Sequence, residues 1–305
     1  MPAFQPGLVH MPVTPFQPDL KIDFGRFESV VAFHLKNGAQ ALALPMHVGE
    51  SVSLSDAEQR QLLDFTMKAV RGRVPVIAHT SDAGTRIAAR RARYAQDIGA
   101  AAIIATTPYY WTPPPDMLIE HLATIASAVT IPFFVFHTPD ELAATRLSPD
   151  IVVKFMRRCP NFAGFVDASH QWQFMIDMIS AAWNVRPDFQ LLSGSEYMVS
   201  AGTIGATGMF TSLAAIAPRL VRKLYDICRT EKYADARKAQ EDIGALAHAL
   251  RKAGGIGAVK GAMSAMGRDC GQPRPPLDVL KAGPRETLLA ELERLAFLKD
   301  EPKGW

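Results

Sequence analysis

The chain has 305 residues, of which 48% are hydrophobic and 21% charged, and its formal net charge is +3. A chain of this size can bury a large core, and acidic and basic residues that are interspersed give no nucleic-acid footprint. The three cysteines are far apart, which excludes a disulfide framework and a CxxC metal site, and no apolar run approaches the length of a membrane span. We therefore expect a cytoplasmic protein with no nucleic-acid or membrane partner.

Eight short aliphatic or β-branched runs occur along the chain, each followed by a stretch of helical periodicity. Most of these runs are apolar throughout, which is typical of parallel strands covered on both faces. An open doubly wound sheet would carry GxGxxG in its first turn, and the sequence has none there. The pattern predicts an α/β fold, a (β/α)8 TIM barrel, with strands at Leu8–Val13, Ala41–Met46, Val74–His79, Ala101–Thr106, Ile131–Phe136, Phe162–Val166, Phe189–Ser193 and Thr207–Phe210.

Local signals predict where several helices begin. Ser55 and Glu58 have the spacing of a capping box, and Ser148 followed by Pro149 predicts a cap and a first helical residue. Beyond the eighth run the pattern is helical and free of strands. We expect the barrel at residues 1–215 and a helical region packed on it at residues 216–305, with helices at Pro218–Arg229, Tyr233–Ala253 and Arg285–Leu298.

Short motifs stand at the ends of the predicted strands. VTPF follows the first strand, GES the second and TPYY the fourth; RVPVIA runs through the third, and Ser193-Gly194 and Val259-Lys260 come later. In this order the motifs resemble those of the dihydrodipicolinate synthase and N-acetylneuraminate lyase family, over residues 7–265. The resemblance implies a barrel with its active site at the carboxyl ends of the strands, assembled as a homodimer or homotetramer.

The resemblance fails at the residue on which the chemistry of this family depends. Family members form a Schiff base between a 2-oxo acid and a lysine at the end of the sixth strand, where this chain has Val166. A valine cannot form an imine, so we expect chemistry without a Schiff base. Lys260 lies in an apolar run, but it matches a second lysine that the family keeps, which favours a structural role. Lys154 lies at a polar helix position and is a weaker candidate.

Three neighbouring features of the family are also replaced. The proton-relaying tyrosine of the fifth strand corresponds to Phe136, the carboxylate-binding arginine to Glu141, and the threonine pair after the second strand to His47 and Val48. Only Tyr110, which in the family reaches into the site of a neighbouring subunit, is retained. The substitutions indicate that the substrate need not be pyruvate and that an aromatic or more neutral substrate would suit the pocket.

Five of the eight histidines fall at or just beyond strand ends: His10, His47, His79, His137 and His170. An imidazole titrates near neutral pH and can move a proton without a covalent intermediate. Neutral imidazoles with a carboxylate, from Asp167 or Glu50, could instead hold a divalent metal that polarises a carbonyl.

These patterns define three sets of candidate site residues. The catalytic candidates are His47, His79, Tyr110, His137 and Asp167. The candidate ligands of a divalent metal such as Zn²⁺ are His47, His79, His137 and Asp167. The substrate-binding candidates are Val48, Glu50, Tyr109, Phe136, Val166, Ser193 and Ser195.

The strand register leaves one question open. Side chains alternate along a strand, and in the family the residues at the places of Phe136 and Val166 face the pocket. His137 and Asp167 therefore face either the pocket, at a bent strand end, or the helix layer. A basic helix surface with Arg86, Arg90, Arg91 and Arg93 is interpreted as a solvated face.

The sequence favours a lyase-type enzyme that cleaves, hydrates or isomerises a small carbonyl-containing substrate by acid–base or metal-assisted chemistry. Two alternatives are kept: a non-catalytic ligand-binding or regulatory descendant, and an aldolase of the family type that uses a relocated lysine.

Overall fold

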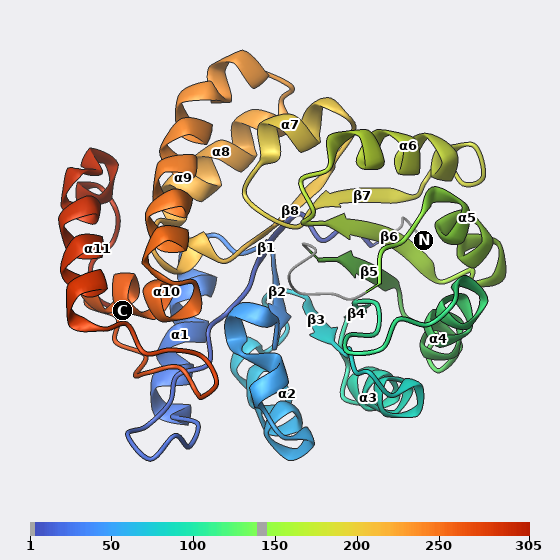
Figure 1. Ribbon diagram of the computed structural model, residues 1–305, viewed down its shortest axis with the longest axis horizontal. Helices are drawn as coiled ribbons and strands as arrows, with labels where there is room; N and C mark the ends of the chain where they lie inside the picture. Colours follow the sequence, from blue (N-terminus) through green and yellow to red (C-terminus); the bar gives the residue numbers. More distant parts are fainter. Residues whose placement is uncertain (1–3, 139–144) are drawn as a thin grey trace. The chain divides into compact units, whose positions relative to one another are not determined.

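All eight predicted strands are present, and they form a closed parallel barrel. The computed structural model describes residues 4–138 and 145–305, and neighbouring strands pair in chain order (Figure 1). The strands are β1 Leu8–His10, β2 Ala41–Leu44, β3 Val76–His79, β4 Ala102–Ala105, β5 Phe133–His137, β6 Phe162–Asp167, β7 Gln190–Ser193 and β8 Gly208–Thr211. The predicted TIM barrel is confirmed.

Helices separate the strands and continue beyond the last one. The α-helices are α1 Phe24–Lys36, α2 Asp56–Val70, α3 Thr85–Asp97, α4 Pro115–Ser127, α5 Pro149–Arg158, α6 Trp172–Trp183, α7 Met198–Thr203, α8 Pro218–Arg229, α9 Tyr233–Ala253, α10 Ile256–Ala265 and α11 Ala282–Arg294. The short 3-10 helices are η1 His47–Gly49, η2 Ser51–Ser53, η3 Leu213–Ala215 and η4 Ala296–Lys299. In the described part of the chain, none of these helices combines the length and apolar character needed to cross a membrane.

The two predicted helix starts are confirmed. Ser55 forms a complete capping box: its hydroxyl accepts the Glu58 N–H, and the Glu58 carboxylate accepts the Ser55 N–H. The Ser148 hydroxyl accepts the Ile151 N–H ahead of Pro149. Each cap satisfies a backbone donor that the helix itself leaves unpaired.

Most strands are shorter than the predicted runs, and β1 and β2 end clearly earlier than the sequence pattern predicts. The apolar runs extend to Val13 and Met46, but β1 ends before Pro12 and β2 ends before Pro45. A proline has no N–H to donate to a neighbouring strand, so pairing stops where it occurs. The prolines therefore define the ends of these two strands.

The C-terminal region contains one helix that the sequence does not predict. Gly257 and Gly261 lie within α10, and each lowers helix stability by roughly 1 kcal/mol relative to alanine. The helix packs against α9 and α11, so tertiary contacts compensate for the weak local preference. The last predicted helix, Arg285–Leu298, is also corrected: α11 ends at Arg294 and is followed by η4.

Contacts group the chain into two compact units. The first unit comprises the segment up to Gly7, Pro75–Ser195 and Ser200–Phe210. The second comprises Leu8–Val74, Glu196–Val199 and Thr211–Trp305. The division into residues 1–215 and 216–305 stays a prediction.

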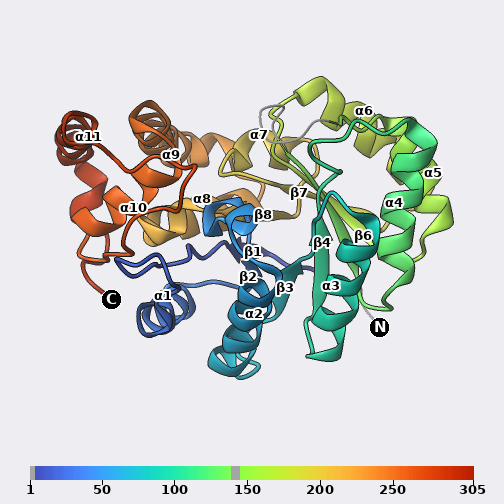
Figure 2. The same cartoon turned by 60° about the horizontal axis from the view of Figure 1, so that its bottom comes forward.

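An aromatic cluster fills the core of the first unit. Phe162 of β6 lies 4.4 Å from Phe155 of α5 and 4.9 Å from Phe189, measured between ring centroids, and all three side chains are buried. Burying one such side chain contributes about 1.5–3 kcal/mol, and each ring pair adds about 0.5–1.5 kcal/mol. Figure 2 shows α3 to α6 following one another along the outer side of their strands. This packing fixes the strands whose ends carry the candidate site.

The second unit gathers the C-terminal helices, with α9 in contact with α8, α10 and α11 (Figure 1). Arg268, which follows α10, is completely buried and donates to the carbonyl oxygens of Ile216 at 3.1 Å and Pro302 at 2.6 Å. Its guanidinium also lies 4.3 Å from the ring of Phe33 on α1. One cation therefore joins the turn after β8, the C-terminal segment and α1.

A buried pair of histidines lies in the second unit. The Nδ1 atoms of His10 and His34 are 3.0 Å apart, so one ring donates a hydrogen bond to the other. Burial lowers the pKa of His34 to about 3 and the pKa of His10 well below its usual value. Both rings are therefore neutral in the folded protein at pH 7.

We expect this pair to make the protein less stable in acid. An unfolded histidine has a pKa near 6.5, so the unfolded state binds these protons first, and stability present above pH 6.5 is lost as pH falls toward 3. Each histidine contributes a slope of about 1.4 kcal/mol per pH unit at most. Urea denaturation between pH 7 and 4 should show a smaller slope in His10→Leu/His34→Leu. A replacement of the exposed His248, His248→Leu, serves as control; an unchanged slope in the double variant contradicts the assignment.

Candidate active site at the strand ends

The carboxyl ends of β5, β6 and β7 are aligned in the first unit. His137 pairs with Asp167 in the strand register, and Asp167 pairs with Ser193. His79 ends β3 in the same parallel sheet. Because parallel strands end at one edge, His137, Asp167 and Ser193, all predicted from sequence, lie side by side on neighbouring strands.

His137 and Asp167 form a buried hydrogen-bonded pair. His137 Nδ1 is 2.8 Å from Asp167 Oδ1, and the Ser169 hydroxyl donates to the same carboxylate at 2.9 Å. The imidazole packs against Phe174 of α6, with ring centroids 4.6 Å apart. The pair therefore lies between the sheet and the helix layer.

Phe136 and Val166, the preceding residues, face the opposite way. The Phe136 ring lies 6.3 Å from the ring of Phe210 on β8, so it points to the inside of the sheet. Val166 pairs with Phe136 in the register and is 0% exposed. This answers the question that the sequence left open: His137 and Asp167 face the helices, and apolar side chains occupy the inner face at this level.

A second polar cluster follows β3. His79 is half-buried, and its Nε2 is 2.7 Å from the hydroxyl of Ser81. The same hydroxyl oxygen accepts the backbone N–H of Thr106 at 2.8 Å, which leaves the Ser81 hydrogen available to the imidazole. The hydrogen bonds of Ser81 thus fix the orientation of the His79 ring.

One basic residue on α3 is not solvated as the sequence pattern suggests. Arg91 donates to the carbonyl oxygen of Ser81 at 2.7 Å and lies 3.1 Å from the carboxylate of Asp82, and its side chain is only 13% exposed. Tyr109 lies near this ion pair: burial raises the pKa of its hydroxyl, and the charge of Asp82 raises it further. Arg91 therefore supports the loop after β3.

A third cluster lies on the loops after β6 and β7. His170 is exposed, has a φ of 59°, and places Nε2 at 2.8 Å from the Ser195 hydroxyl. The Ser193 hydroxyl donates to the Ser195 carbonyl at 2.6 Å. Gly194 lets the two loops meet, because an added Cβ would lie 2.8 Å from the Cβ of Ala168.

Tyr110 and its neighbour lie on the surface. Tyr110 is 85% exposed, has a φ of 74°, and its ring packs edge-on against Trp111, itself 62% exposed. The tyrosine that the resemblance identifies as reaching into a neighbouring subunit is thus accessible.

In the second unit, His47 begins η1 after β2. Its side chain is exposed, whereas Val48 beside it is buried. The surrounding protein, by desolvation, lowers the pKa of His47 to about 4. The imidazole is therefore neutral at pH 7, and one of its ring nitrogens can accept a proton.

Glu50 has a role that the sequence does not predict. One carboxylate oxygen lies 2.6 Å from Lys260 Nζ, and the other accepts the Arg274 N–H at 2.8 Å. Both side chains of the ion pair are buried, and desolvation lowers the pKa of Lys260 although Glu50 opposes that shift. We assign Glu50 as a structural carboxylate, because its oxygens are engaged within the protein.

A divalent-metal site stays a prediction. Among residues 4–138 and 145–305, no group of three or more His, Cys, Asp or Glu side chains is placed to hold an ion. His137 and Asp167 instead bond to each other. Glu141, which the resemblance aligns with a carboxylate-binding arginine, lies outside the described residues.

Sequence reasoning missed the serines that complete these clusters. Ser81 and Ser169 each stand two residues after a polar strand-end residue, His79 and Asp167. A spacing of two returns a side chain to the same side of an extended segment, so the pattern HxS and DxS was the available signal. The partner of His170 is 25 residues away and left no local signal.

Known proteins resemble this chain over nearly its whole length. The model of the dihydrodipicolinate synthetase family matches residues 5–295. The chain belongs to the dihydrodipicolinate synthetase family. A 4-hydroxy-tetrahydrodipicolinate synthase from Methanopyrus kandleri is 31% identical over 297 residues, covering 96% of this chain and 97% of that protein. The enzyme of the same name from Bacillus subtilis is 27% identical over 284 residues, covering 93% and 97%.

Solved structures of the family share the fold. A crystal structure of a dihydrodipicolinate synthase superposes with a TM-score of 0.89 at 25% identity, covering 96% of this chain and 100% of that one. The dihydrodipicolinate synthase of Aquifex aeolicus superposes with a TM-score of 0.91 at 24% identity, covering 98% and 99%. The family resemblance expected from the motifs is confirmed, and the chain is a member of a lyase family.

We expect Gly194→Ala to destabilise the protein by roughly 1–3 kcal/mol, because the new methyl group would overlap Ala168 between two strand-end loops. The free energy of unfolding from urea titration measures this. Gly244→Ala is the matched control: Gly244 lies within α9 with no atom within 4 Å of the added Cβ, so alanine should stabilise the helix by about 0.5–1 kcal/mol. Equal effects of the two substitutions would contradict the packing argument.

Proposed function

We propose that this family member is a lyase-type enzyme that acts on a small carbonyl-containing substrate by proton transfer, without forming an imine. The observation that carries the proposal is Val166, a fully buried valine on β6 where the family resemblance expects the Schiff-base lysine. Phe136 stands beside it on β5 in place of the expected tyrosine. The inner face at this level therefore offers neither an amine nor a phenol.

The distribution of lysines supports the same proposal. The first unit, which carries the ends of β3 to β7, contains a single lysine, Lys154, and it is exposed on α5. Lys260 in the second unit is bound to Glu50 at 2.6 Å and to the carbonyl oxygen of Gln272 at 3.3 Å. An amine that is buried and bound to a carboxylate and a carbonyl oxygen within the protein is not free to attack a substrate carbonyl.

Histidines supply the proton-transfer groups in this proposal. His79 is half-buried and oriented by Ser81, and His47 is exposed and neutral at pH 7. A neutral imidazole takes a proton from the carbon next to a carbonyl, or from a hydroxyl, and the resulting imidazolium returns it to the product. Tyr110 is retained as a candidate proton donor, from its own or a neighbouring subunit.

His137 and Asp167 act as positioning residues in this proposal. Both are buried against α6, and their hydrogen bond joins the ends of β5 and β6. Ser193, the next residue in the register, begins the loop that carries Ser195. We propose that Ser195 and Tyr109, which both belong to the first unit, make polar contacts with the substrate.

No step of this mechanism passes through a metal, because the candidate ligands His47, His79, His137 and Asp167 do not form a coordinating group within the described residues. We also propose a homodimer or homotetramer. The exposed rings of Tyr110 and Trp111 support an assembly in which this loop is covered.

Borohydride trapping tests the absence of an imine. We expect no reduced adduct on any lysine after incubation with pyruvate and sodium borohydride, as read by intact-mass and peptide mass spectrometry, because Val166 cannot condense with a carbonyl. The Bacillus subtilis relative, treated in parallel, serves as the positive control. An adduct on Lys260 or Lys154 would establish a relocated lysine and overturn the proposal.

Replacing His79 tests the proton-transfer proposal. Exchange of carbon-bound hydrogen in D₂O, followed by NMR with pyruvate, 2-oxobutanoate and acetophenone, should be about 10²–10⁴-fold slower in His79→Asn. His248→Gln, a change on the exposed face of α9, is the control and should retain the wild-type rate. Exchange that survives in His79→Asn removes His79 from the mechanism, and no exchange by the wild-type protein favours a non-catalytic ligand-binding descendant.

A further inference from the structure

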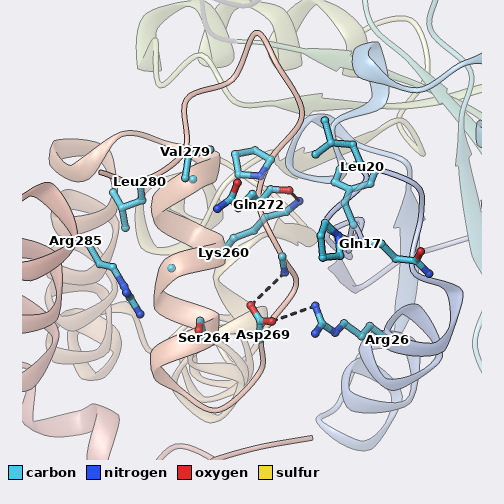
Figure 3. Close-up of a pocket in the computed structure, with 16 residues that line it drawn as sticks. Gln17, Leu20, Arg26, Lys260, Ser264, Asp269, Gln272, Val279, Leu280 and Arg285 are labelled. Atoms are coloured by element: carbon cyan, nitrogen blue, oxygen red, sulfur yellow. Dashed lines mark hydrogen bonds and ion pairs between the residues drawn. The ribbon is translucent and has the colours of Figure 1, made fainter. Parts of the chain in front are cut away.

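A separate cleft lies in the C-terminal part of the second unit. It has a volume of about 470 Å³, which is within the range of small-molecule sites. Its walls come from the segment after β1, the start of α1, α10, the segment after α10 and α11 (Figure 3). None of the candidate catalytic or substrate-binding residues lines it.

The floor of the cleft is one face of α10 with no large side chain. Gly257, Gly261 and Ser264 follow one another at spacings of four and three residues, which places them on one side of the helix. Leu280 closes over this face, since a Cβ added to Gly261 would lie 2.7 Å from its Cδ2. The two glycines therefore let the segment that carries Leu280 pack directly against α10, and both glycines line the cleft.

Apolar and charged groups line different parts of the cleft. Phe16, Leu280 and the half-exposed Val279 supply apolar surface. Lys260 extends from α10 toward Gln272 (Figure 3). Glu50, which does not line the cleft, lies 2.6 Å from the Lys260 ammonium and neutralises its charge. The apolar groups can cover the body of a ligand.

The cationic lining is only partly neutralised. Arg26 pairs with Asp269 at 3.1 Å, so these two charges cancel. Arg285, at the start of α11, makes no side-chain hydrogen bond or ion pair with any residue that the structure describes, and the Ser264 hydroxyl likewise has no partner there. The cleft therefore presents one uncompensated guanidinium and one open hydroxyl.

We propose that this cleft binds a small organic anion with a carboxylate and an apolar body. The Arg285 guanidinium presents a planar pair of donors that matches a carboxylate, and the Ser264 hydroxyl supplies a further donor. Leu280 and Val279 cover the apolar body. A neutral ligand would gain no charge-assisted hydrogen bond from the exposed Arg285, and a purely inorganic anion would leave the apolar wall exposed to water.

Calorimetric titration of the full chain with 3-phenylpropionate tests the proposal. We expect saturable binding that becomes about tenfold weaker or more in Arg285→Gln, since a charge-assisted hydrogen bond is lost. Arg294→Gln is the matched control, because Arg294 is an exposed arginine at the other end of the same helix and does not line the cleft. Circular dichroism of both variants verifies that they are folded.

Two ligands isolate the two recognition elements. Neutral 3-phenylpropanamide keeps the ring and loses the charge, and propionate keeps the charge and loses the ring; each should bind at least about tenfold more weakly. The proposal is overturned by no binding of 3-phenylpropionate, by equal affinity in Arg285→Gln, or by equal affinity for the amide or for propionate. The experiment measures binding and not catalysis, so a failure of the cleft proposal is distinguishable from a failure of the proposed catalytic function.

Discussion

The alternation of side chains along β5 and β6 is the constraint on which the interpretation of this barrel depends. Two consecutive residues of β6, Val166 and Asp167, face opposite sides of the sheet, and their partners on β5, Phe136 and His137, do the same. The chain therefore has an apolar inner face and a polar pair on the helix side at the same level. A single-residue shift of the register would exchange them and would place an aspartate inside the sheet.

Much of the fold follows from local sequence. Strand positions depend on short apolar runs, and the caps at Ser55 and Ser148 depend on residues three apart, so a linear pattern contains both. Helix α10 could not be predicted from local sequence, because its glycines weaken the helix preference and the helix is stabilised by packing against α9 and α11. The ends of β1 and β2 depend on Pro12 and Pro45, which have no backbone N–H to donate, and a hydrophobic pattern alone does not indicate them.

The candidate site could be predicted less completely. The strand-end histidines are visible in the sequence because each follows an apolar run, and the serine partner of His79 is two residues away. The pairing of Glu50 with Lys260 spans 210 residues, and no local pattern encodes it. Arg91 shows a related difficulty: helical periodicity assigned it to a charged surface, but its length lets the guanidinium reach back to Asp82 and the loop after β3.

The buried ion pair of Glu50 and Lys260 also limits how this sequence can change over time. Removing either partner leaves a single charge without water, at a cost of about 3–5 kcal/mol, whereas replacing both together with apolar groups is often neutral. A lineage that alters one position first must pass through an unstable intermediate. Lys260 is therefore held in place by its contact with Glu50, and its presence carries no information about which chemistry the protein performs.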